Sequence, residues 1–237
     1  MSNHDTNVDQ AEIAKFEQLA HKWWDENSEF KPLHDINPLR ANYIDQRAEL
    51  PGKLHLDVGC GGGLLTEACT QRGANSTGID MGEAPLSVAK LHALESELNI
   101  EYLQIPAEQF AEERPEYYDV VTCLEMLEHV PDPSSIVKAC ADLCKPGGQL
   151  FFSTINRNPK SYAFAIIGAE YLLRLLPKGT HEYSKFIKPA ELAHAIRAAG
   201  LELVESTGMV YNPLTKKYSL SDSDLDVNYL MHARKPL

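Results

Sequence analysis

Residues 54–63 read Leu-His-Leu-Asp-Val-Gly-Cys-Gly-Gly-Gly and constrain the fold of this chain more than any other segment. The first five alternate apolar and polar side chains as a buried strand does, and the strand then runs into glycines. Glycine adopts backbone conformations closed to other residues and lets a ligand approach the main chain closely. A second strand-like stretch ends at Asp80, 21 residues after Gly59, where a carboxylate can accept both hydroxyls of a ribose. This pattern predicts a site for an adenosine-containing cofactor.

Two classes of cofactor share this layout. A dinucleotide fingerprint has a third glycine where this chain has Leu64, and a helix N-terminus that faces a pyrophosphate. Asp57 lies two residues before the first glycine, where its carboxylate would repel a pyrophosphate but suits a cationic amino group. S-adenosylmethionine carries an ammonium, a sulfonium and a ribose, and it has no phosphate. The sequence therefore favours S-adenosylmethionine, held by Asp57, Gly59, Gly61 and Asp80, over NAD; a structural turn without a ligand is the alternative.

Composition narrows the class of protein further. The 22 basic and 34 acidic residues give a net charge of −12, which argues against a nucleic-acid partner. The five cysteines show no paired metal spacing and suit free thiols in a reducing compartment. The polar start lacks a hydrophobic signal region, and the chain has no apolar run that could cross a bilayer. We expect an intracellular protein with a disordered segment at 1–8 and a single domain at 9–237.

Strand-like and helical stretches alternate along most of this domain. After a helical segment at 9–50, they predict a doubly wound α/β sheet of seven strands, Rossmann-like and mostly parallel, with ligands over the carboxyl ends of the strands. The last two strands have no helix between them and predict an antiparallel pair at the sheet edge. The predicted strands are 54–58, 75–80, 100–105, 119–124, 150–155, 201–210 and 226–233, and the predicted helices are about 62–72, 84–98, 133–144 and 189–199.

Glu125, Glu128 and His129 form a second informative cluster directly after the predicted strand 119–124. Their spacing of i, i+3 and i+4 places all three side chains on one face if the segment is helical. Two carboxylates and an imidazole could then hold a divalent metal. Oxygen ligands favour Mg²⁺, while the histidine leaves Mn²⁺ and Zn²⁺ open. Structural capping and hydrogen bonding are the alternative role for these residues.

Several blocks of the sequence resemble the ubiquinone biosynthesis O-methyltransferase family, within the class I S-adenosylmethionine-dependent methyltransferases. The blocks are 30–34 (Phe-Lys-Pro-Leu-His), 37–40 (Asn-Pro-Leu-Arg), 125–133 (Glu-Met-Leu-Glu-His-Val-Pro-Asp-Pro), 153–157 (Ser-Thr-Ile-Asn-Arg) and 178–181 (Lys-Gly-Thr-His). The resemblance implies a methyltransferase fold with an antiparallel C-terminal strand. It also implies methylation of two polyprenylated catechol-type substrates, 2-polyprenyl-6-hydroxyphenol and 3-demethylubiquinol. A methyltransferase for another soluble phenol or acid is the alternative.

The resemblance also implies roles for individual residues. Arg40 would bind the methionine carboxylate of the cofactor, Gly59 would contact the cofactor through its backbone, and Asp80 would hold the ribose. Leu124 would touch the cofactor beside the adenine or ribose, at a position where relatives often have Met. A metal held by Glu125, Glu128 and His129 is implied for part of the family.

The expected reaction is an in-line transfer of a methyl group from sulfur to a phenolic oxygen. The pKa of a phenol is about 10, so at neutral pH the site must stabilise the phenolate. A metal does so as a Lewis acid. If no metal binds, His129 or Glu128 is the expected catalytic base.

Residues 157–188 form a longer insertion than the fold needs. Six Lys and Arg residues oppose two Glu residues in it, so that it carries +4 within a chain of −12. A basic amphipathic helix of this kind is attracted to an anionic membrane surface; a lid over the active site is the alternative. The resemblance implies a cytoplasmic enzyme bound peripherally to the inner membrane and associated with other enzymes of ubiquinone synthesis.

Overall fold

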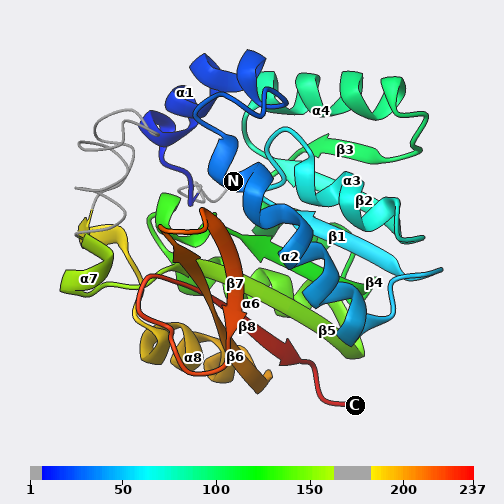
Figure 1. The fold of residues 1–237 in the computed structure, drawn as a ribbon. Helices are drawn as coiled ribbons and strands as arrows, with labels where there is room; N and C mark the ends of the chain where they lie inside the picture. The colour runs from blue at the N-terminus through cyan, green and yellow to red at the C-terminus, as the bar shows by residue number, and fades with distance from the viewer. Residues whose placement is uncertain (1–6, 163–182) are drawn as a thin grey trace.

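The structure, a computed structural model, describes residues 7–162 and 183–237, and Figure 1 shows its helices packed around one central sheet. The strands are β1 (Leu54–Val58), β2 (Asn75–Asp80), β3 (Glu101–Gln104), β4 (Tyr118–Leu124), β5 (Cys144–Ile155), β6 (Glu202–Asn212), β7 (Lys217–Ser221) and β8 (Asn228–Arg234). The helices are α1 (Gln10–Leu19), η1 (Ala20–Lys22), α2 (Lys31–Ala48), α3 (Leu64–Thr70), α4 (Glu83–Glu95), α5 (Ala107–Glu113), η2 (Leu127–His129), α6 (Pro133–Leu143), α7 (Pro159–Ser161), η4 (Tyr183–Lys185) and α8 (Pro189–Ala198).

The first five strands form the parallel part of the sheet, in the order β3-β2-β1-β4-β5. The strands predicted at 54–58 and 75–80 are confirmed at both ends. In β1 the last four residues are buried, because the strand lies between β2 and β4 and is covered on both faces. This arrangement brings the carboxyl ends of β1, β2 and β4 to one edge of the sheet, which confirms the predicted doubly wound architecture.

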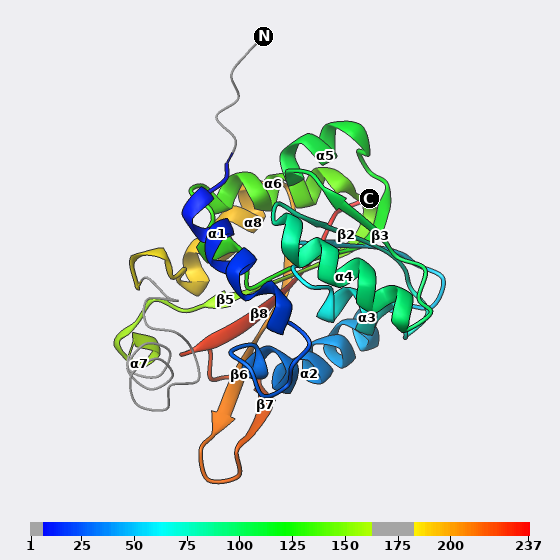
Figure 2. The ribbon, with the colours of Figure 1, turned by 90° about the horizontal axis from the view of Figure 1, so that it is seen from above.

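Helices cover both faces of the sheet. Figure 2 shows α5, α6 and α8 over one face, with α2 and α3 over the other. One apolar cluster joins α5, α6 and α8 to the strands and includes Phe110, Val137 and Phe152, all almost fully buried. A second cluster joins α2 and α3 to the opposite face through Ile44, Cys69 and Phe151. The two clusters hold the carboxyl edge of the sheet in place from both sides.

The C-terminal part of the sheet differs from the prediction. In the part of the chain that the structure describes, the sheet has eight strands. Strand β8 lies between β5 and β6 and pairs antiparallel with both, and β7 forms the edge. The two strands predicted after residue 200 do pair with each other, but not at the edge. The physical reason is burial: residues 229–233 of β8 are buried, which suits a central strand. The partly exposed β7 reads Lys-Tyr-Ser-Leu-Ser. This alternation is a strand signal, but it spans only five residues, and no strand was predicted there.

The N-terminal segment is helical, as predicted, and packs against the carboxyl edge of the sheet. Helix α1 begins at the N-cap Asp9, whose side chain accepts hydrogen bonds from the Ala11 and Glu12 amides. Just before it, the Asn7 side chain donates to the Asp132 carbonyl at 2.7 Å. Residues 1–6 of the segment predicted to be disordered lie outside the described residues. The helices α1 and η1 thereby reach the edge where the predicted site residues lie.

Candidate active site

The glycine loop after β1 is shaped by tight contacts with other parts of the chain. Gly59 has a φ of +73°, and a Cβ at this position would overlap the side chain of Met126. A Cβ on Gly61 or Gly62 would overlap the indole of Trp23, which lies against the loop. Larger residues would therefore displace the side chains that cover the loop. The glycines predicted from the sequence keep the backbone accessible at the edge of the cavity.

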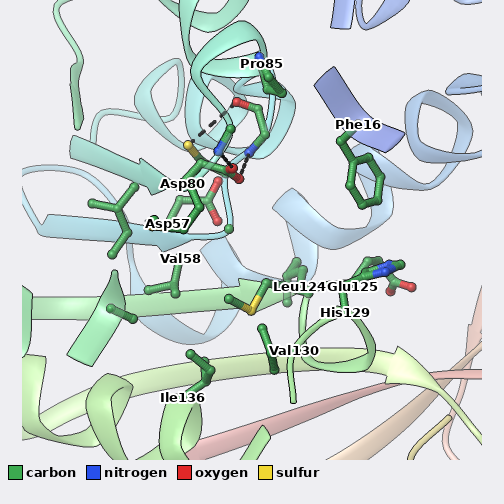
Figure 3. Close-up of a pocket in the computed structure, with 18 of the residues that line it drawn as sticks. Phe16, Asp57, Val58, Asp80, Pro85, Leu124, Glu125, His129, Val130 and Ile136 are labelled. Carbon is green, nitrogen blue, oxygen red and sulfur yellow. Dashed lines mark hydrogen bonds between the residues drawn. The ribbon is translucent and has the colours of Figure 1, made fainter. Parts of the chain in front are cut away.

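Asp80 fixes the conformation of this loop from the end of β2. Its Oδ2 accepts a hydrogen bond from the Gly61 amide at 2.9 Å, and its Oδ1 accepts one from the Gly82 amide at 2.8 Å (Figure 3). Burial raises the pKa of Asp80, although the backbone amides favour the charged form. Each carboxylate oxygen can accept a further hydrogen bond. The predicted contact with the ribose is therefore compatible with the two hydrogen bonds from the backbone amides.

Asp57 belongs to a buried polar chain beneath the loop. Its Oδ2 accepts from the Thr66 hydroxyl at 2.6 Å, and its Oδ1 accepts from the Thr122 hydroxyl at 2.8 Å. Burial raises the pKa of Asp57 to about 6, against the effect of these two hydrogen bonds. The same Thr122 hydroxyl lies 3.0 Å from Nε2 of His55, whose Nδ1 lies 3.1 Å from the Ser76 hydroxyl. This series of hydrogen-bonded side chains therefore extends from the cavity into the sheet.

We expect His55 to make the fold labile to acid. Burial lowers its pKa from 6.5 to about 3, so below pH 6.5 the unfolded chain binds a proton that the folded chain does not. Between pH 6.5 and pH 4 the free energy of unfolding should lose about 1.4 kcal/mol per pH unit through this residue. Urea unfolding at several pH values should show a shallower acid slope for His55→Asn than for the exposed control His194→Asn. Equal slopes would contradict this prediction.

Arg40 and Glu125, predicted for two different subsites, contact each other directly. Arg40 projects from α2 and donates through Nη2 to Glu125 Oε1, with only 6% of the arginine side chain and 16% of the glutamate side chain exposed. Glu125 also accepts from the Ser153 hydroxyl at 2.7 Å and from Nδ2 of Asn228 at 3.0 and 2.9 Å. Leu124 is buried at the end of β4 and lines the same cavity. A residue predicted to bind the cofactor, Arg40, therefore contacts a residue predicted to bind the metal, Glu125.

Glu128 and His129 have separate partners. The Thr154 hydroxyl donates to Glu128 at 2.8 Å, and burial together with repulsion from Glu125 raises the pKa of Glu128 to about 7. His129 Nδ1 lies 2.9 Å from Glu12 Oε2 on α1. Burial disfavours the charged imidazole, but the hydrogen bond to Glu12 and the nearby carboxylates outweigh it and raise the pKa of His129. The His129 contact in turn lowers the pKa of Glu12 strongly.

The predicted metal arrangement is not formed by these side chains. The helical face assumed for it is absent, because Glu125 has a φ of +53° and precedes the short turn η2 (Leu127–His129). Glu125, Glu128 and His129 instead point to Arg40, Thr154 and Glu12. Within residues 7–162 and 183–237, no group of three or more His, Cys, Asp or Glu side chains is placed to hold a metal ion. The donor set as arranged therefore does not fit a metal.

Sequence reasoning missed the N-terminal contribution to the site. Glu12 is buried and also accepts from Nζ of Lys185 at 3.1 Å, which ties α1 to the segment before α8. Phe16 on α1 meets the His129 ring edge-on, with centroids 5.1 Å apart. The helical stripe at 9–27 indicated that this helix packs on something. Its partners in the site, His129 and Lys185, lie more than 100 residues away, where no local pattern could identify them.

Acidic side chains predominate around the cavity. Figure 3 shows Asp57 and Asp80 at one end of the cavity, with Glu125 and His129 at the other. Among the described residues, six acidic side chains line the cavity and Arg40 is the one Lys or Arg that does. The acidic residues are Asp9, Glu12, Asp57, Asp80, Glu108 and Glu125. A pyrophosphate does not suit this lining, whereas a cationic ligand with a single anionic group fits it.

Comparisons of sequence place this chain among methyltransferases. A family described as a methyltransferase domain matches residues 34–206. A ubiquinone biosynthesis O-methyltransferase from Saccharophagus degradans is 66% identical over 235 residues, covering 99% of this chain and 100% of the relative. One from Pseudomonas entomophila is 68% identical over 226 residues, covering 95% of this chain and 97% of the relative.

Solved structures share the fold. Magnesium protoporphyrin IX methyltransferase from Synechocystis PCC 6803 with bound SAH superposes with a TM-score of 0.62 at 20% identity, covering 98% of this chain and 90% of that one. A SAM-dependent methyltransferase from Thermotoga maritima gives a TM-score of 0.67 at 15% identity, covering 93% of this chain and 98% of that one. At these identities the likeness concerns the fold alone.

Proposed function

The chain belongs to the ubiquinone biosynthesis O-methyltransferase family, and we propose that it methylates phenolic hydroxyls of polyprenylated catechol-type intermediates. The substrates proposed are 2-polyprenyl-6-hydroxyphenol and 3-demethylubiquinol. The observation that supports this reading best is the acid-rich cavity with one arginine at the carboxyl edge of β1, β2 and β4. S-adenosylmethionine, when bound, supplies an electrophilic methyl group on a sulfonium. Its two positive charges and single carboxylate match the lining.

The residues proposed to hold the donor lie around the glycine loop. Asp80 would accept the ribose hydroxyls, and Asp57 would offset the positive charge of the amino group. Arg40 would bind the carboxylate, and Leu124 would pack beside the adenosine. Gly59 and Gly61 line the cavity and would contact the donor through their main chain.

The proton of the phenol requires an acceptor. His129 lines the cavity, and Glu12 holds its Nδ1, which orients the ring and leaves Nε2 without a hydrogen-bond partner among the described residues. We propose the neutral form of His129 as the base that takes the proton. Glu128 is the second candidate: its pKa of about 7 makes it a better proton acceptor than an ordinary carboxylate, although it is not among the residues that line the cavity. Another soluble phenol, the alternative substrate, would use the same base, whereas a soluble acid is already ionised at neutral pH and would need none.

The predicted Mg²⁺ at Glu125, Glu128 and His129 needs a separate test. Such a site would require Glu125 to leave Arg40 and Glu128 to leave Thr154, so no step is assigned to a metal here. Turnover that EDTA abolishes and Mg²⁺ restores would support the metal prediction. If EDTA does not change turnover, the metal prediction is contradicted and the side chains alone must accept the proton.

The decisive assay measures turnover of S-adenosylmethionine on a short-chain prenyl catechol. We expect methylation of the catechol and tight binding of S-adenosylhomocysteine. His129→Gln should lower kcat at least tenfold with little change in the dissociation constant for S-adenosylhomocysteine, because general bases commonly contribute 10²–10⁴-fold. Equal turnover of a catechol without a prenyl chain would favour the soluble-phenol alternative. Preferential binding of NADH would contradict the proposed function.

Membrane attachment is a further part of the proposal, and it rests on charge. No helix of the described residues is long and apolar enough to cross a membrane. Most of the basic insertion, residues 163–182, lies outside the described residues. Within the described part, Lys160 pairs with Asp224 and Asp226, and Lys185 pairs with Asp9 and Glu12. Arg157 pairs with Glu191, whereas the exposed Lys188 has no ion pair among the described residues. Attraction to an anionic surface would therefore depend mainly on Arg174, Lys178 and Lys188.

We expect the chain to cosediment with anionic liposomes and not with neutral ones. Reversing both charges, with Arg174→Glu and Lys178→Glu, should weaken this binding by roughly 1 kcal/mol or more per residue, because each basic residue near the surface contributes about that much. Cosedimentation unaffected by the reversal or by deletion of 161–177 would exclude this surface. The cytoplasmic, inner-membrane location and the association with other enzymes of ubiquinone synthesis stay predictions.

A further inference from the structure

Two buried donors on residues that line the cavity have no acceptor. Nε1 of Trp23 and Nε of Arg40 have no hydrogen-bond partner among the described residues. Both residues line the cavity, and only 7% of Trp23 and 5% of Arg40 is exposed. A buried N–H without a partner costs free energy, and two such groups beside one cavity indicate a missing acceptor.

The position of Trp23 is fixed by packing rather than by its N–H group. The indole lies against Gly61 and Gly62 on one side and stacks on Phe30 at 4.2 Å between ring centroids. The neighbouring Trp24 differs, because its Nε1 donates to the Gly62 carbonyl at 2.9 Å. Both tryptophans contact the glycine loop, and of the two only Trp24 donates its N–H group to another of the described residues.

Arg40 is likewise only partly used. Its Nη2 donates to Glu125, while its Nε–H is the unpaired group. None of the six acidic side chains that line the cavity accepts a hydrogen bond from either donor. Asp57 and Asp80, for example, are already bonded to hydroxyls and loop amides. A ligand carboxylate would satisfy the indole and guanidinium donors and would balance the charge of Arg40.

We propose that Trp23, through its indole N–H, forms the carboxylate subsite of the methyl donor together with Nε of Arg40. This inference rests on the proposed function, because it assigns a further residue to the binding of the same donor. Trp23 thereby contributes to specificity: it distinguishes the intact amino-acid end of the donor from adenosyl compounds that lack a carboxylate.

The test compares two ligands that differ by one group: S-adenosylhomocysteine and its decarboxylated analogue, S-adenosyl-3-thiopropylamine. Trp23→Phe keeps the aromatic contact with the loop but removes the N–H. Calorimetry should show roughly tenfold weaker binding of S-adenosylhomocysteine, as expected for loss of one hydrogen bond to a charged group. Binding of the decarboxylated analogue should change less than twofold. Trp24→Phe, the matched control, should affect both ligands equally.

A second measurement uses the unaltered protein and does not depend on how Trp23→Phe folds. The chain has two tryptophans, so its ¹⁵N spectrum should contain two indole N–H signals, which Trp24→Phe assigns. S-adenosylhomocysteine should shift the Trp23 signal, and the decarboxylated analogue should leave it near its free position.

The outcomes separate this inference from the proposed function. Equal weakening of both ligands by Trp23→Phe, or equal shifts of the Trp23 signal with both ligands, would overturn the carboxylate subsite while leaving the methyl donor in place. Failure of the unaltered protein to bind either ligand would overturn the proposed function and the subsite with it.

Discussion

Asp80→Asn is expected to weaken binding of S-adenosylhomocysteine by about 100-fold or more. Both oxygens of Asp80 accept hydrogen bonds from loop amides, one from Gly61 and one from Gly82. An asparagine would turn one acceptor into an NH₂ group facing a backbone N–H, which costs about 1–3 kcal/mol for the group left unpaired. The proposed ribose contacts would be lost as well, so the effects on the loop and on the ligand combine. Calorimetric titration measures the result directly.

The chain offers a matched control for this substitution. Asp132 also accepts from two backbone amides, those of Ser134 and Ser135, but it does not line the cavity. Asp132→Asn should leave the affinity for S-adenosylhomocysteine within twofold, since asparagine is as good an N-cap as aspartate. If Asp80→Asn binds as tightly as the Asp132 variant, Asp80 does not hold the donor.

Arg40→Met should lower both stability and donor affinity. The Arg40–Glu125 pair is almost completely buried, and removal of one partner of such a pair costs about 3–5 kcal/mol because the other charge is left uncompensated. We expect the lower end of this range, since Ser153 and Asn228 continue to bond Glu125. Donor affinity should fall by about 100-fold with the loss of the proposed contact to the carboxylate.

The double variant Arg40→Met with Glu125→Gln separates the two effects. It removes the uncompensated charge, so chemical denaturation should show part of the stability regained, while donor affinity should stay low. Arg47→Met provides the control on the same helix, because its pair with Glu205 is far more exposed and should contribute about 1 kcal/mol at most. Equal destabilisation by the Arg40 and Arg47 substitutions would contradict the assigned burial of the Arg40 pair.

The parallel half of the sheet was predictable because its signals are local. Strand β1 alternates apolar and polar residues before the glycine loop, β2 ends at Asp80 after Gly78 and Ile79, and both predicted ranges were confirmed. The carboxyl edge of the sheet follows from that alternation. The prediction was wrong about seven strands and about an edge pair after residue 200, because it did not include β7, a five-residue run whose alternation is a weak signal without its hairpin partner β6.

The sequence indicated which residues lie at the candidate site, but not which of them contact each other. The glycine loop, Asp57, Asp80, Arg40 and Leu124 all line one cavity, as the spacing and the resemblance suggested. The partnership of Arg40 with Glu125, and that of His129 with Glu12, joins residues that are 85 and 117 positions apart. Such contacts depend on how whole elements pack. No periodicity or motif within a short window can determine them.

The position of β8 between β5 and β6 sets the order in which a growing chain can assemble. Since synthesis proceeds from the N-terminus, β6 leaves the ribosome before the strand that must separate it from β5 exists. Until β8 arrives, β6 and its hairpin partner have no native place on the parallel strands. Asn228 at the start of β8 is also a partner of Glu125, so the acidic side of the active site is completed only at this late step.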